Sequence, residues 1–136
     1  MSLNKVMLIG NAAKELDVKS MQNGSKIANL NVATSEYWSD KTSGEKKTKT
    51  EWHRIVIYGD ALIDMLQKRI VTGSKLYVEG KLQTRKWQNK AGVDQFITEI
   101  LIQGFHSKIE ILDGNSVKDS SEPKNIEEEE IDEVPF

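Results

Sequence analysis

The chain has 136 residues and a net charge of −2, with 38% apolar and 29% charged residues, as expected for one small globular domain with a tail. It contains no cysteine, which excludes a disulfide framework and a thiolate metal site. No stretch approaches the roughly 20 apolar residues of a membrane helix, and the N-terminal residues lack the pattern of a secretory signal. We therefore expect a cytoplasmic protein with no membrane partner.

The apolar pattern predicts five strands and one short helix along the chain. The strands are expected at residues 5–9, 27–34, 51–58, 76–87 and 96–112, the last interrupted at Gly104. Asn23-Gly24 predicts a hairpin turn, and the Lys- and Thr-rich residues 39–50 predict a long mobile hairpin loop. The helix is expected to begin with Asp60 as its cap and to end at Gly73.

One short helix between strands three and four of a five-stranded antiparallel sheet is the layout of an OB-fold barrel. A β-sandwich would need more strands and a doubly wound α/β fold more helices. The expected fold class is therefore all-β with one short helix, a five-stranded OB-fold β-barrel. Residues 1–112 form the predicted barrel domain, residues 113–125 a short flexible linker, and residues 126–136 an acidic tip within a disordered tail.

Charge is distributed unevenly between body and tail. From Asp113 onward the chain has nine acids and two bases, a net of −7. Residues 1–112 hold 12 acids and 17 bases, a net of +5. A basic body suggests a polyanionic partner, and an acidic tail suggests a different one. A tail that only aids solubility remains the alternative interpretation.

Aromatic and basic residues fall together at the strands and strand ends. In the third predicted strand, period-2 alternation places Trp52, Arg54 and Tyr58 on one face and Ile55 and Ile57 on the other. Similar groupings occur around Trp38 and at Arg85-Lys86-Trp87. We expect the barrel to gather all three tryptophans on one surface. Rings that stack on bases, beside cations that neutralise phosphates, are typical of single-strand binding proteins. The alternative is that the tryptophans are partly buried core residues.

The lysines of the predicted loop and the histidine of the third strand have two interpretations each. Lys41, Lys47 and Lys49 form either a solvated loop or an extension of the electrostatic groove. His53 alternates inward, which favours a structural role or a subunit contact over that of a ligand or base. Little material is present for a metal, a cofactor or a catalytic triad.

Several stretches together resemble the bacterial single-stranded DNA-binding proteins. They are Asn4–Val6, Gly10-Asn11, Ala33–Glu36, Thr50–Arg54, Tyr77–Gly80, Thr84–Trp87 and Pro135-Phe136. The resemblance implies an OB-fold homotetramer that binds and protects single-stranded DNA in replication, recombination and repair, associated with the nucleoid. It implies base stacking at Trp38, Trp52, Tyr58 and Trp87, and a subunit contact at His53. Here Tyr58 stands where the family often has phenylalanine.

The end of the tail predicts a second function. Acids, an apolar ring and a terminal carboxylate occur together there, and a basic, hydrophobic pocket of a partner protein can capture such a group. The residues that we expect to bind the partner are Asp132, Glu133, Val134, Pro135 and Phe136. The resemblance implies that replication and repair proteins dock on them. The linker is shorter than the long Gly-, Pro- and Gln-rich one often found in this family.

Two other functions have to be weighed on the residues alone. A nuclease built on an OB-fold would need clustered carboxylates, and the acids of the body show no close metal-ligand spacing. The sequence therefore predicts that the protein is not an enzyme. An OB-fold RNA binder or primosome accessory protein would use similar barrel chemistry.

Overall fold

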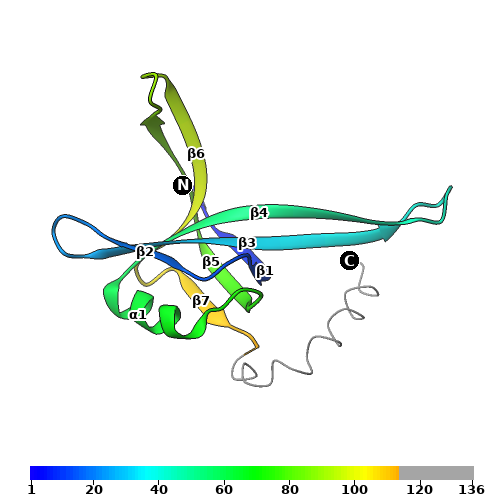
Figure 1. Ribbon diagram of the computed structural model, residues 1–136, viewed down its shortest axis with the longest axis horizontal. Helices are drawn as coiled ribbons and strands as arrows, with labels where there is room; N and C mark the ends of the chain where they lie inside the picture. Colours follow the sequence, from blue (N-terminus) through cyan, green and yellow to red (C-terminus); the bar gives the residue numbers. More distant parts are fainter. Residues whose placement is uncertain (114–136) are drawn as a thin grey trace.

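The computed structural model describes residues 1–113, which form seven strands and one helix (Figure 1). The strands are β1 (Val6–Ala12), β2 (Asp17–Ser20), β3 (Lys26–Ser39), β4 (Lys46–Tyr58), β5 (Lys75–Gln88), β6 (Asp94–Ile102) and β7 (Lys108–Ile111), and the helix is α1 (Asp60–Arg69). The predicted break at Gly104 is confirmed, since it separates β6 from β7 with a φ of 84°. The hairpin turn at Asn23-Gly24 is confirmed between β2 and β3, although β2 itself was not predicted.

Five of these strands close into a barrel. The pairings run β1-β3-β4-β6-β5, and β5 pairs again with β1, so the ring has no open edge. β2 and β7 add to β3 and β5 outside this ring. The prediction of a β-barrel with one short helix is therefore confirmed. The expectation of a fully antiparallel sheet is wrong, because β4 and β6 run parallel, with α1 and β5 between them in the chain.

The core fills the inside of the barrel with alternate strand residues. Ile55, Ile57, Leu76 and Val78 are fully buried there. Helix α1 contributes Ile63 and Leu66 to the same cluster and contacts β3 and β4. Burial of a side chain of this size stabilises the fold by roughly 1.5–3 kcal/mol.

Two glycines allow the barrel to close. A Cβ on Gly10 would lie 2.4 Å from the carbonyl oxygen of Ala33, where β1 approaches β3. A Cβ on Gly80 would lie 2.4 Å from the carbonyl oxygen of Leu101, where β5 approaches β6. Only a residue without a side chain lets the two backbones come so close.

Two long ribbons extend from the barrel (Figure 1). β3 and β4 stay paired from Ile27–Tyr58 out to Ser39–Lys46, and β5 and β6 from Lys81–Leu101 out to Gln88–Asp94. The prediction of a loop over residues 39–50 is wrong, because only residues 40–45 leave the ladder. Cross-strand pairs support the added length, among them the Ser35 and Thr50 hydroxyls at 3.0 Å.

The helix ends differ from their prediction. Gly59 is the N-cap, and no side chain caps the first turn. The Asp60 carboxylate instead accepts a hydrogen bond from the Lys26 backbone N–H at 2.9 Å. The helix ends at Arg69, and Gly73, with a φ of 92°, belongs to the turn that leads into β5. No helix among residues 1–113 is long and apolar enough to cross a membrane.

Candidate nucleic-acid interface

The outer face of β4 presents aromatic and basic side chains. Ile55 and Ile57 point into the core, so alternation turns Trp52, Arg54 and Tyr58 outward. Trp52 is 64% exposed, Arg54 is exposed and Tyr58 is half-buried. This face carries a ring open to solvent beside a cation, as the period-2 pattern predicted.

Strand pairing places two residues of β5 on the same face. Val56 of β4 pairs with Leu101 of β6, and Leu101 pairs with Lys81 of β5. Alternate residues from Lys81 onward then bring Arg85 and Trp87 to this side. Trp87 is 46% exposed. We call this surface the fork face, and its residues are Trp52, Arg54, Tyr58, Arg85 and Trp87.

The remaining basic residue of the predicted cluster at the end of β5 lies on the other side of its ribbon. Lys86 pairs across the ladder with Phe96, which is 69% exposed and was not singled out from the sequence. Lys86 also forms an exposed ion pair with Asp94 at 3.8 Å. Aromatic and basic side chains therefore lie on both sides of this ribbon.

Trp38 lies on the opposite face of its ribbon from Trp52. It pairs with Lys47. Alternation along the ladder places both residues on the same face as Val32 and His53, whereas Trp52 lies on the other face. The expectation that a single surface gathers all three tryptophans is therefore wrong for one protomer. The cause is the unbroken β3–β4 ladder. Side chains alternate between the two faces along a continuous strand pair, and Trp38 and Trp52 fall in opposite phases of that alternation.

The predicted lysines accompany Trp38 rather than the fork face. Lys47 and Lys49 share its side of the ribbon and form exposed ion pairs with Glu45 at 3.7 Å and Glu51 at 3.5 Å. Exposed pairs of this kind contribute little to stability, so both lysines are available to a polyanion. Lys41 is exposed in the connecting loop.

Arg85 is held by a carboxylate that the sequence analysis did not single out as a site residue. Its Nε donates to Glu99 Oε1 at 2.7 Å, and its Nη2 donates to Glu99 Oε2 at 3.4 Å. The Glu99 side chain is fully buried, whereas the Arg85 side chain is 52% exposed. The hydrogen bond to Glu99 raises the pKa of the Arg85 guanidinium, and the Tyr58 phenol adds a smaller electrostatic contribution in the same direction.

His53 lies on the inward side of β4, where the ribbon leaves the barrel. Its Nε2 is 2.8 Å from the Thr34 hydroxyl oxygen, and its ring is half-buried. This position agrees with a structural role within the protomer, while the predicted subunit contact remains a prediction.

A second polar cluster lies on β5 beside β1. The Lys5 ammonium and the Tyr77 hydroxyl both donate to the Glu79 carboxylate. These two hydrogen bonds lower the pKa of Glu79, and the one from Lys5 has the larger effect. The cluster lies on the outer side of β5, in the part of the strand that pairs with β1. Arg85 and Trp87 lie further along β5, beyond that pairing.

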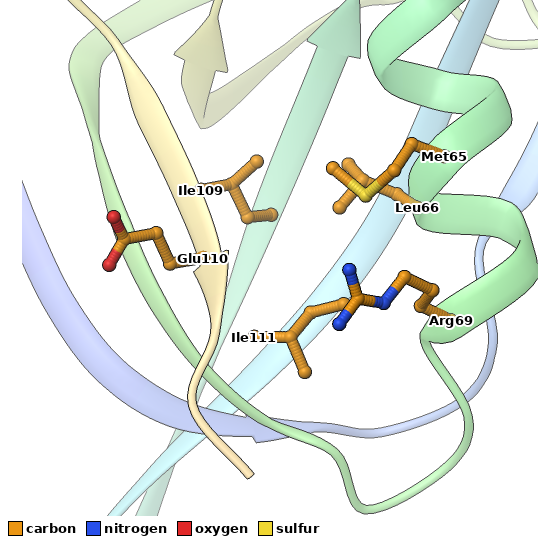
Figure 2. Close-up of a pocket in the computed structure, with 6 residues that line it drawn as sticks. All are labelled: Met65, Leu66, Arg69, Ile109, Glu110 and Ile111. Carbon is orange, nitrogen blue, oxygen red and sulfur yellow. The ribbon is translucent and has the colours of Figure 1, made fainter. Parts of the chain in front are cut away.

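A small open hollow of about 260 Å³ lies between α1 and β7, lined by Met65, Leu66, Arg69, Ile109, Glu110 and Ile111. Figure 2 shows Arg69 reaching toward Ile111, while Glu110 points away. None of its lining residues belongs to the fork face. No group of three or more potential metal ligands occurs in the described part of the chain.

The tail predictions concern residues beyond those that the structure describes. Apart from Asp113, the predicted linker over residues 113–125 lies outside the described residues, and so does the acidic tip over residues 126–136. The expected partner-binding site therefore stays a prediction from the sequence. Its residues, none of which the structure describes, are Asp132, Glu133, Val134, Pro135 and Phe136.

Residues 3–112 match the Single-strand binding protein family. The Single-stranded DNA-binding protein of Rhizobium meliloti is 48% identical over 113 residues, which cover 83% of this chain and 65% of that protein. That of Rickettsia felis is 41% identical over 149 residues, covering 99% of this chain and 98% of that protein. A solved Plasmodium falciparum SSB complex with ssDNA has a TM-score of 0.71 and 40% identity, covering 82% of this chain and 96% of that one. The chain therefore belongs to the Single-strand binding protein family, whose members are non-enzymatic DNA-binding proteins.

Proposed function

We propose that the chain binds and protects single-stranded DNA, without strong sequence preference, by stacking bases on the fork face. The observation that carries the proposal is Trp52, an indole 64% exposed on the outside of a closed barrel and next but one to an exposed arginine. Exposing so large an apolar ring has a cost in water that a stacked base would remove.

Stacking explains selectivity for single strands. An aromatic ring gains roughly 1–3 kcal/mol per stacked base, and it does so for every base because each has a π-face. In a duplex these faces are already covered by neighbouring bases. Arg54 and the lysines near Trp38 add the sequence-independent attraction for phosphates.

Both faces of the β3–β4 ribbon take part in the proposed binding. Trp52 and Arg54 serve one side, and Trp38 with Lys47 and Lys49 serves the other. A strand that uses both sides must pass around the ribbon edge or reach Trp38 across another protomer. This agrees with the proposed homotetramer, in which His53 lies at a subunit contact.

The relatives support the same substrate. Two are described as single-stranded DNA-binding proteins, and the solved neighbour is a complex with ssDNA at 40% identity. We propose that this chain acts likewise in replication, recombination and repair in a bacterial cytoplasm. Partner proteins would dock on the tip, where Asp132 and Glu133 supply negative charge and Phe136 supplies a ring and a carboxylate.

A fluorescence titration tests the proposal. Intrinsic tryptophan emission is followed while oligo(dT) of increasing length, or a duplex of equal phosphate content, is added. We expect strong quenching that saturates with the single strand and weak quenching with the duplex. Unchanged emission at saturation, or equal responses to both, would overturn the stacking proposal.

Two further arms separate the alternatives. Competition between DNA and RNA oligonucleotides of the same length distinguishes the proposed function from RNA binding, and we expect DNA to win. Incubation of labelled oligonucleotide with Mg²⁺ should leave it intact, whereas cleavage products would indicate a nuclease.

A further inference from the structure

Glu99 is a buried carboxylate on a face that is otherwise open. Its side chain has no exposed surface, although it shares the side of β6 that faces outward with Leu101 and, across the ladder, Gln83. Burying a charge is costly unless it is paired and hydrogen-bonded. Here hydrogen bonds from Arg85 and Gln83 offset the cost of burying the Glu99 charge, and both donors lie on the fork-face side of the sheet.

These contacts fix the guanidinium of Arg85. Nε donates at 2.7 Å and Nη2 at 3.4 Å, so one edge of the planar group is committed to Glu99. Gln83 Nε2 donates to the same Oε1 at 3.1 Å, which holds the carboxylate from a second side. A guanidinium has five N–H groups, and those on its other edge are left for a ligand on the exposed side.

Arg54 differs from Arg85 in this respect. It is exposed on the same face, but no carboxylate lies within ion-pair distance of it among residues 1–113. Arg54 therefore keeps its full charge. Arg85, bound to a buried carboxylate, belongs to a pair with no net charge and one orientation.

We propose that Glu99 is a positioning residue for DNA binding: it orients the Arg85 guanidinium so that its outer N–H groups meet a phosphate oxygen of a strand on the fork face. Arg85 then acts by directed hydrogen bonds, while Arg54 acts mainly by charge. This inference rests on the proposed function and adds a residue that touches no DNA itself.

The test is a double-mutant cycle on oligo(dT) affinity. Glu99→Asp keeps the charge but shortens the side chain, so the carboxylate no longer reaches Arg85 in the same geometry. We expect binding to weaken about tenfold, the size of one lost hydrogen bond to a charged group. In an Arg85→Gln background the same change should have no effect on affinity. Glu110→Asp, the same substitution at an exposed glutamate of β7, is the matched control and should bind like the unmodified chain.

Salt dependence provides a second readout that a purely structural role would not move. Glu99→Gln keeps an oxygen that accepts from Nε but leaves Arg85 with its full charge. The slope of log affinity against log salt should steepen by about 0.7, the value for one phosphate contact on a single strand. Thermal unfolding followed by circular dichroism shows whether each variant folds. If Glu99→Asp does not fold, the salt dependence of Glu99→Gln still tests the inference.

Three outcomes would overturn the inference. They are a Glu99→Asp variant that folds and binds normally, an equal loss with and without Arg85, and an unchanged salt slope in Glu99→Gln. If the unmodified chain neither binds oligo(dT) nor shows quenching, the proposed function itself fails. The two failures are therefore distinguishable.

Discussion

Replacing Trp52 by alanine removes the most exposed indole of the fork face. The ring is 64% exposed. With about 250 Å² for a whole tryptophan side chain, about 160 Å² faces solvent, and a base stacked on one side covers about half of that. At about 25 cal/mol per Å² the lost contact is worth about 2 kcal/mol. We therefore expect the Kd for a short oligo(dT) to rise about 30-fold, with a change of about 0.5 kcal/mol or less in the free energy of unfolding.

The assay is fluorescence anisotropy of a labelled oligo(dT), with urea unfolding of the same preparations. Trp52→Phe keeps a ring and should retain most of the affinity. Phe105→Ala removes a fully exposed ring that lies in the turn between β6 and β7 and is not one of the fork-face residues, and this variant should bind normally. A Trp52→Ala variant that binds within error of the unmodified chain would refute the stacking argument, and a loss matched by Phe105→Ala would show that the effect is nonspecific.

Three further changes test the closure of the barrel, the tail and the cluster around Glu79. Gly80→Ala should destabilise the barrel by about 1–3 kcal/mol in urea unfolding, because its Cβ meets the Leu101 carbonyl oxygen at 2.4 Å; unchanged stability would contradict the close approach. Deleting Val134–Phe136 should abolish capture of replication and repair proteins from a bacterial lysate while oligo(dT) affinity stays the same or rises; retained capture would contradict the tip proposal. Lys5 lowers the pKa of Glu79, so the stabilisation is present above the ordinary value of about 4.5 and lost as pH falls through the lower folded value. The Tm difference between the unmodified chain and Glu79→Gln should thus shrink in acid, and a constant difference would argue against this linkage.

Much of the fold follows from local patterns. Alternation around Ile55 and Ile57 predicted which side of β4 faces the core and which side carries Trp52. The Asn23-Gly24 turn and the interruption at Gly104 were each marked by a glycine in the sequence. Both glycines have a positive φ in the structure. These features depend on residues that are close together in the sequence, so they can be predicted from one sequence.

Other features depend on contacts between distant residues. The parallel pairing of β4 with β6 and the closing pair of β1 with β5 leave no local pattern. The extension of β3 and β4 to Ser39 and Lys46 uses Thr, Lys and Glu side chains, whose composition is also that of a loop. Composition therefore predicted a loop where cross-strand pairing forms a ladder.

The candidate site shows the same division. The aromatic and basic residues were apparent in the sequence, but their assignment to one surface failed for Trp38 because of its register with Lys47. Glu99 was not singled out because it lies within an apolar run, on the same outward-facing side of the strand as Ile97. Its partner Arg85 is distant in the sequence, and no local pattern links the two residues. Only the pairing of β5 with β6 brings the two together.

Photochemical crosslinking reports directly whether bases lie against the rings of the fork face. A single strand carrying 5-iodouracil is bound to the full chain, irradiated, and the attached residues are identified by mass spectrometry. We expect crosslinks at Trp52, Tyr58 and Trp87. Efficient crosslinking confined to residues elsewhere, such as α1 or β7, would contradict it.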